Sequence, residues 1–187
     1  DLYKERFGFK KPNSMQVAVK EAAAAINKPG ILVLEAPMGS GKTEAALVCA
    51  EIFANKTNRS GVFFALPTQA TSDGILPRII KWIQKLESNE LHTIELAHSK
   101  AQFNQEIQSL RFLQGSSAIG EDEEISAFVH QWFEGQKKAL LADFVVGTID
   151  QLLLAALKQK HVMLRHLGLT GKVVIIDECH AYDAYMG

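Results

Sequence analysis

The sequence predicts an α/β fold built around a mostly parallel central sheet. Four short apolar runs rich in β-branched or aromatic residues supply its strands: 31–35, 61–67, 143–148 and 172–177. A weaker fifth run covers 92–98. Continuous apolar runs, rather than alternating ones, are typical of strands that are covered on both faces. Helical patterns lie between the runs, and this alternation favours a parallel sheet with right-handed crossovers.

Helical periodicity predicts the segments that connect the strands. The first helix covers 14–26, with Ser14 as its expected N-cap, and the second covers 42–55. Further helical patterns cover 70–86, 100–113, 127–142 and 149–159. Pro77 interrupts the first of these, and we expect a helix start or a kink there.

One segment departs from the alternation. Residues 114–126, QGSSAIGEDEEIS, contain two glycines and four consecutive acids. A run of like charges favours a solvated surface over packed structure. We therefore expect an acidic loop or insertion here, within one domain that covers 1–187.

Composition bounds the class of protein. Hydrophobic residues make up 47% of the 187 residues and charged ones 22%, which is typical of a globular chain. The formal net charge of −1 gives no global basic field, so any contact with nucleic acid must be local. Cys49 and Cys179 are far apart and lack metal-type spacing, which favours a reduced, cytoplasmic chain. No signal-peptide pattern and no membrane-spanning run is found, so we expect no membrane partner.

A phosphate loop follows the first predicted strand. Residues 36–43 read APMGSGKT, with Ala36 in place of the usual first glycine. Gly39 and Gly41 let the backbone curl so that its N–H groups converge on phosphate oxygens, and the following helix points its N-terminus at the same anion. Lys42 can reach the β- and γ-phosphates, and the Thr43 hydroxyl can ligate Mg²⁺. The expected nucleotide-binding residues also include Met38, Ser40 and Glu44.

An acidic pair follows the last predicted strand. Asp177 and Glu178 come directly after VVII, and strand ends in such sheets face the ligand crevice. We expect Asp177 to hold Mg²⁺, usually through a water, and Glu178 to act as the base that polarises the attacking water. His180 next to Cys179 has poor spacing for a zinc site.

The DECH run resembles the Walker B box of DExH helicases of superfamily two, which have a P-loop NTPase, RecA-like three-layer fold. In that superfamily a proline-threonine pair ends the strand after the phosphate-loop helix, and a glycine or threonine motif ends a later strand. Both grip the nucleic-acid backbone. Here Pro67 and Thr68 match the first pair, and Gly147 and Thr148 match the second. Gln69 stands where many relatives carry arginine. Such neutral donors suit a grip that does not depend on sequence.

Longer stretches resemble the CRISPR-associated helicase-nucleases of type I interference, over nearly the whole chain. The most specific are GTIDQLL and HAYDAYM. The resemblance implies ATP as fuel, single-stranded DNA as track, and recruitment by the Cascade surveillance complex to unwind and degrade foreign DNA. It also implies that Gln16 reads adenine and that His180 couples nucleotide state to the DNA path.

The resemblance further implies parts that this sequence does not contain. The family carries an HD nuclease domain and a second RecA-like lobe, so we expect this chain to be the first motor lobe, inactive alone. Two alternatives stay open: a nucleotide-binding or protein-docking module without turnover, and the first lobe of another DExH helicase. A P-loop kinase or GTPase is disfavoured because no N-K-x-D motif is present.

Overall fold

The computed structural model describes residues 1–86, 92–97, 127–128, 139–157 and 162–179. The chain divides into two compact units, Asp1–Ser60 and Gly61–Gly187, which are described separately below. The expected acidic segment and the helix expected at 100–113 lie outside the described residues. None of the described helices is long and apolar enough to cross a membrane.

The first unit contains three helices: α1 (Leu2–Phe7), α2 (Ser14–Ala25) and α3 (Lys42–Thr57). Helices α2 and α3 pack through a small apolar cluster of Val19, Ala23, Ala45 and Cys49. The small alanines allow the two helices to approach closely. Asn13, not Ser14, is the N-cap of α2, because its side-chain oxygen accepts the Gln16 N–H.

The prediction of a strand at 31–35 is wrong, because the structure has no strand there. The segment keeps a two-residue alternation, in which Leu32 and Leu34 pack against the α2–α3 cluster while Ile31 and Val33 are 92% and 87% exposed. The first unit contains no strand, so this segment has no hydrogen-bonding ladder within the unit. An apolar run supplies the side chains of a strand, but a strand also needs a partner edge.

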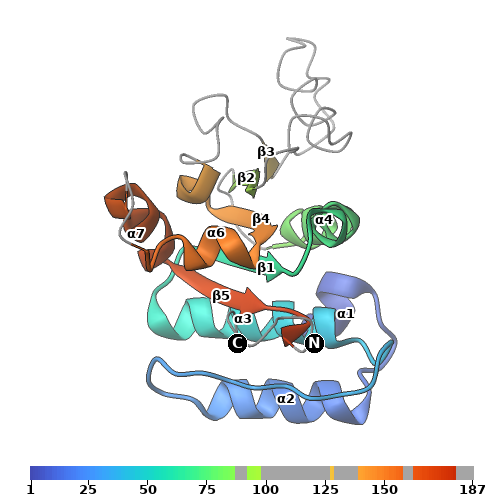
Figure 1. Cartoon of the computed structure of the whole chain (residues 1–187). Coiled ribbons are helices and arrows are strands. Elements are labelled where there is room, and N and C mark those ends of the chain that lie inside the picture. Colours follow the sequence, from blue (N-terminus) through green and yellow to red (C-terminus); the bar gives the residue numbers. More distant parts are fainter. Residues whose placement is uncertain (87–91, 98–126, 129–138, 158–161, 180–187) are drawn as a thin grey trace, which may run out of the picture. The chain divides into compact units, whose positions relative to one another are not determined.

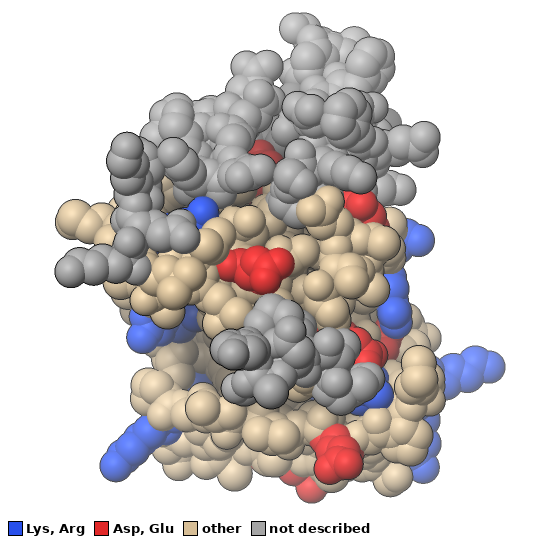
Figure 2. All heavy atoms as spheres, viewed as in Figure 1, with Lys and Arg blue, Asp and Glu red and all other residues tan. Residues whose placement is uncertain are grey.

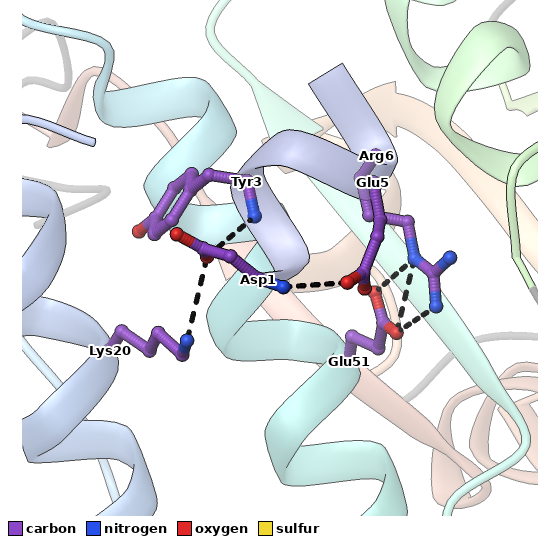
Figure 3. Close-up of polar contacts among 6 residues, drawn as sticks. All are labelled: Asp1, Tyr3, Glu5, Arg6, Lys20 and Glu51. Atoms are coloured by element: carbon purple, nitrogen blue, oxygen red, sulfur yellow. Dashed lines mark hydrogen bonds and ion pairs between the residues drawn. The ribbon is translucent and has the colours of Figure 1, made fainter. Parts of the chain in front are cut away.

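Helix α1 is tied to both other helices of its unit, and Figure 3 shows the Arg6–Glu51 pair that ties it to α3. The Tyr3 hydroxyl, fully buried, donates to the Gln16 carbonyl of α2 at 3.0 Å. The Arg6 guanidinium donates through Nε and Nη2 to the Glu51 carboxylate of α3, with the Nη2 to Oε1 distance at 2.7 Å. Both partners of this pair are largely buried, so the fork geometry fixes α1 against α3.

The second unit contains a parallel sheet of strands in the order β3-β2-β4-β1-β5, which follow one another down Figure 1. Their bounds are β1 Gly61–Leu66, β2 His92–Ala97, β3 Ala127–Phe128, β4 Phe144–Thr148 and β5 Lys172–Ile176. The strands predicted at 61–67, 92–98, 143–148 and 172–177 are therefore confirmed, as is the α/β class with a parallel sheet.

Helices cover both faces of this sheet. On one face, Ile149 of α6 (Ile149–Leu153) and residues 139–140 of the short helix η3 (Ala139–Leu141) pack in one cluster with Phe63 and Val145. On the other face, Trp82 of α4 (Gln69–Ile83) contacts Phe144 edge-on, with ring centroids 5.6 Å apart. Phe144 and Val145 point to opposite faces because successive strand residues alternate.

Three helix predictions need correction. Helix α4 begins after Thr68 and runs through Pro77, so Pro77 does not start it, and the alternative of a kink at Pro77 stays a prediction. The helix predicted at 127–142 is absent at both of its described ends, where β3 and η3 are found. Helix α6 ends at Leu153, short of the predicted residue 159. Helices α1 and α7 (Val162–Thr170) had no sequence prediction.

Candidate nucleotide and nucleic-acid site

The phosphate loop leads directly into the 16-residue helix α3. Gly39 and Gly41 both adopt positive φ, +74° and +84°, a conformation that L side chains rarely take. Gly41 is the N-cap of α3, and its carbonyl accepts the Ala45 N–H at 3.1 Å. Because Gly41 has no side chain, no side-chain cap occupies the amides of the first turn of α3. These amides face an anion-binding position at a helix N-terminus.

Lys42 extends over the loop that precedes it. Its Nζ donates to the carbonyls of Ala36 at 2.9 Å and Pro37 at 3.2 Å. Thr43 follows in the first turn of α3 and is half-buried, whereas Glu44 is buried and Met38 is 86% exposed. Lys42 and Thr43 thus lie at the start of α3.

Gln16 is only 3% exposed, and its amide is engaged at both ends. Oε1 accepts the Asn13 N–H at 3.1 Å, and Nε2 donates to the Gly41 carbonyl at 3.4 Å. The first bond is half of a capping box at the start of α2. The structure therefore gives Gln16 a role inside the protein, and its role in reading adenine stays a prediction.

The acidic pair follows β5 in the second unit. The Asp177 N–H donates to the Ala65 carbonyl at 3.0 Å, which extends the β1–β5 pairing by one step. The Asp177 Oδ1 accepts the Glu178 N–H at 2.9 Å. Glu178 has φ of +53°, an uncommon conformation for a residue other than glycine. The chain thus turns sharply at Glu178, and both carboxylates are half-buried.

No group of three or more His, Cys, Asp or Glu side chains that could hold a metal is found among the described residues. A magnesium ion at Thr43 or Asp177 would therefore be held together with other oxygen ligands, as is usual for Mg²⁺ bound with phosphates. His180, the predicted coupling residue, lies outside the described residues.

The predicted DNA-contacting pairs end neighbouring strands. In the β1–β4 register Leu66 lies opposite Thr148, so Pro67, Thr68 and Gln69 continue past the same edge of the sheet as Gly147 and Thr148. Thr68 is exposed and is the N-cap of α4, with its hydroxyl accepting the Thr71 N–H at 3.2 Å. Thr148 precedes α6 as its N-cap, yet its hydroxyl makes no cap bond.

Gly147 has a packing role at this edge. A β-carbon on it would lie 3.0 Å from both the Cβ and the carbonyl oxygen of Ala97 on the neighbouring strand β2. The close packing of β2 therefore accounts for a glycine at position 147, and no ligand is needed to explain it. The DNA contacts of all five strand-end residues stay predictions.

Sequence analysis missed Asn13 and Tyr3, which both hold Gln16. Asn13 also donates from Nδ2 to the Ser40 carbonyl of the phosphate loop at 2.9 Å. The signal for Asn13 was present, because an Asn followed three residues later by Gln is a capping-box pattern. No comparable pattern marks Tyr3.

Comparison with known proteins identifies the group to which these features belong. The family described as Type III restriction enzyme, res subunit, matches residues 9–185. The chain belongs to this family. It is also 50% identical over 188 residues to the CRISPR-associated nuclease/helicase Cas3 of Streptococcus thermophilus, a match that covers 99% of this chain and 20% of that protein. The CRISPR-associated endonuclease/helicase Cas3 of Thermus thermophilus is 39% identical over 175 residues, covering 94% of this chain and 19% of that one.

The fold matches that of a solved Cas3 as well. The crystal structure of T. fusca Cas3-ATP aligns with a TM-score of 0.81 and 37% identity, covering 98% of this chain and 20% of that one. The resemblance to CRISPR-associated helicase-nucleases and the RecA-like P-loop fold are thereby confirmed. The chain spans about a fifth of the length of the curated relatives it matches.

Proposed function

We propose that this chain is the ATP-binding motor lobe of a DNA helicase that translocates on and unwinds foreign DNA in CRISPR type I defence. The observation that carries the proposal is the phosphate loop, in which two positive-φ glycines precede the N-terminus of α3. This geometry belongs to a chain that is 50% identical to a Cas3 nuclease/helicase. The fold alone would not assign a function, so the proposal depends on this site.

The proposed roles of the site residues follow from their chemistry. Lys42 supplies a point charge to the β- and γ-phosphates, which the loop amides of Gly39 and Gly41 hold. Glu178 accepts a proton from the attacking water, for which a carboxylate at a strand end is suited. Gln16 reads the adenine base, with Met38, Ser40 and Glu44 around the bound nucleotide.

Magnesium is the proposed metal, and the available donors suit it. The Thr43 hydroxyl and the Asp177 carboxylate are hard oxygen ligands of the kind that Mg²⁺ prefers. When bound, the ion would neutralise charge on the phosphate oxygens. Asp177 is oriented for such a task by the Glu178 N–H, which fixes one of its carboxylate oxygens.

Single-stranded DNA is the proposed track. On the face drawn in Figure 2, the described lysines and arginines stand singly and do not merge into one basic field. A grip on DNA by Thr68, Gln69 and Thr148 would rest on neutral donors to phosphate oxygens, with Pro67 and Gly147 shaping the two strand ends. Such a grip would not depend on base sequence. His180 would couple the nucleotide to this path.

The proposed partners follow from the resemblance to CRISPR-associated helicase-nucleases. We propose that the lobe works with a second RecA-like lobe and an HD nuclease domain in a longer cytoplasmic protein, and that the Cascade complex recruits that protein. The second lobe would supply the arginine that stabilises the transferring phosphoryl group, a contribution of about 10³ to 10⁵ in rate in related NTPases.

Phosphate release tests the proposal. A full-length Cas3 protein that carries this lobe is assayed with Mg²⁺ and ATP, with and without single-stranded DNA, beside its Lys42→Ala variant. We expect DNA-stimulated turnover that the variant abolishes while its melting temperature is retained. The 187-residue chain alone should release little phosphate. An unchanged rate in Lys42→Ala would contradict the phosphate-loop assignment, and nucleotide binding without turnover in the full-length protein would favour a binding module.

A further inference from the structure

Two side chains at the start of α2 hold two carbonyl groups of the phosphate loop. Asn13 Nδ2 donates to the Ser40 carbonyl at 2.9 Å, and Gln16 Nε2 donates to the Gly41 carbonyl at 3.4 Å. Both acceptors belong to consecutive peptide groups immediately before Lys42. These bonds cross 27 and 25 residues of sequence, so they connect α2 with the loop rather than stabilising a local turn.

The orientation of a carbonyl fixes the orientation of the next N–H. A trans peptide group is planar, and its C=O and N–H point in opposite directions. No cis peptide bond occurs in the described residues. With the Ser40 carbonyl turned toward Asn13, the Gly41 N–H points away from α2. In the same way, the Gly41 carbonyl, held by Gln16 and by the Ala45 N–H, turns the Lys42 N–H away from α2.

The donors themselves are held in place. Asn13 Oδ1 accepts the Gln16 N–H at 2.9 Å, and this bond leaves Nδ2 to face the loop. Gln16 Oε1 accepts the Asn13 N–H, which orients Nε2 toward Gly41. Behind them, the buried Tyr3 hydroxyl donates to the Gln16 carbonyl. The amide orientation of each side chain is therefore fixed by the capping box, not left to rotate.

We infer that Asn13 is a positioning residue for the phosphate loop: its side-chain amide holds the Ser40 carbonyl back so that the Gly41 N–H is aimed at the bound phosphates. This inference rests on the proposed function of the loop. It assigns to the N-cap of α2 a second task, separate from capping, that acts on the phosphates and not on the base.

The two tasks of Asn13 can be separated by substitution. Asn13→Ser keeps a good N-cap, because the serine hydroxyl accepts the Gln16 N–H, but it has no donor that reaches Ser40. Asn13→Ala loses both tasks. The probes are inorganic tripolyphosphate and ATP, each with Mg²⁺, added to the 187-residue chain. The readouts are the NMR shifts of the Gly41 and Lys42 amides and the melting temperature.

We expect Asn13→Ser to keep the wild-type melting temperature while its dissociation constants for tripolyphosphate and for ATP rise by the same factor, about threefold to tenfold, as for one lost hydrogen bond. Asn13→Ala should show the same loss of affinity and a lower melting temperature. If serine also lowers the melting temperature, Asn13→Thr, another capping residue, replaces it.

The outcomes separate this inference from the proposed function. Unchanged affinity in Asn13→Ser, with the wild type binding both probes, overturns the inference alone. A loss confined to ATP also overturns it, because the effect would then act through the base. A wild-type chain whose Gly41 and Lys42 amides respond to neither probe overturns the proposed function and this inference with it.

Discussion

Gly41 lies so close to Gln16 that a β-carbon on Gly41 would come within 2.6 Å of Gln16 Nε2. Gln16 cannot easily withdraw, since its amide is bonded at both ends and its side chain is 3% exposed. The phosphate loop and the start of α2 are therefore fitted to each other at a glycine, and the fit involves a side chain as well as the backbone.

We predict that Gly41→Ala damages the loop in two ways. The φ of +84° costs an alanine about 1–2 kcal/mol, and the β-carbon displaces the Gln16 amide from the Gly41 carbonyl. Nucleotide affinity should fall at least tenfold, measured by titration of the chain with ATP. The melting temperature of the first unit should fall as well.

Two other glycines serve as controls. Gly39 also has positive φ, +74°, but open space around its missing β-carbon, so Gly39→Ala should show the strain without the clash. Gly74 lies within α4 at ordinary φ and in open space, so Gly74→Ala should be neutral or stabilising by up to about 1 kcal/mol. Equal effects of Gly39→Ala and Gly41→Ala would show that the contact with Gln16 has no consequence.

The local features of the loop were predictable because they depend on backbone chemistry. Gly39, Gly41 and the following helix are read from spacing alone, and the positive φ angles and the start of α3 at Lys42 agree with that reading. The bonds from Asn13 and Gln16 to the loop were not predictable, because they join residues 25 to 27 positions apart. The prediction of a strand at 31–35 was wrong for a similar reason. A strand forms only where another strand lies beside it to pair with, and the local sequence does not show whether such a partner is present.

Glu178 is the proposed base, and we predict that Glu178→Gln separates binding from chemistry. The variant keeps the shape of the side chain and the backbone bond to Asp177 Oδ1, but it cannot accept the proton of the attacking water. In a full-length Cas3 protein carrying this lobe, ATP binding should be retained and hydrolysis should fall about 10²-fold or more. Phosphate release and equilibrium nucleotide binding are measured on the same preparations.

Asp177→Asn is the matched control for that experiment. A neutral amide is a weaker Mg²⁺ ligand than a carboxylate, so this variant should lose Mg²⁺-dependent affinity together with turnover. If Glu178→Gln loses affinity and turnover equally, Glu178 is a metal ligand and not the base.

Substitutions of Thr68 and Thr148 should weaken DNA binding alike but should differ in their effect on the stability of the fold. Replacing either by valine removes a hydroxyl but keeps the β-branched shape. Thr68→Val also removes the cap of α4, at a cost of about 0.5–2 kcal/mol, whereas the Thr148 hydroxyl makes no cap bond in α6. We expect both variants to weaken single-stranded DNA binding, but only Thr68→Val to lower the melting temperature.

Fluorescence anisotropy with oligonucleotides of different sequence measures this binding. The loss of affinity should be similar for every oligonucleotide sequence. The salt dependence of DNA binding should stay nearly unchanged, because a neutral donor to phosphate releases no counterion. A variant that altered sequence preference would indicate base contact instead.

Helix α7 shows why part of the fold was beyond sequence reasoning. Leu169 of this helix packs against the cluster around Leu140, and two polar contacts add to it: Arg165 Nη1 donates to the Gln151 carbonyl at 3.2 Å, and His166 Nε2 lies 2.7 Å from the Ala155 carbonyl. Met163 and Leu167 on this helix are 81% and 67% exposed. Its apolar residues therefore lie on both the packed and the exposed sides of the helix, and this spread weakens the periodic signal.

The Lys172 ammonium, at the start of β5, lies beneath α7. Its Nζ donates to the Leu140 carbonyl at 2.9 Å and to the Gly168 carbonyl. A β-carbon on Gly168 would lie 2.5 Å from the same Leu140 oxygen, so α7 and η3 are in close contact at this point. Burial lowers the pKa of Lys172 from its ordinary 10.5 to about 8, and the nearby Asp143 only partly opposes this.

We predict that Lys172 makes the stability of the second unit rise with pH between about 8 and 10.5. Below this window the lysine is charged in both states, and the folded state bears the full cost of burying the charge. Within it, the unfolded chain holds the proton that the folded chain has released, so the free energy of unfolding increases with pH.

Lys172→Met cannot titrate and provides the reference, although the lost bonds shift its baseline. The difference in unfolding free energy, wild type minus Lys172→Met, should increase by about 1–3 kcal/mol from pH 7.5 to 10.5 in denaturant titrations. A flat difference would mean that the carbonyls of Leu140 and Gly168 stabilise the charged ammonium as well as water does.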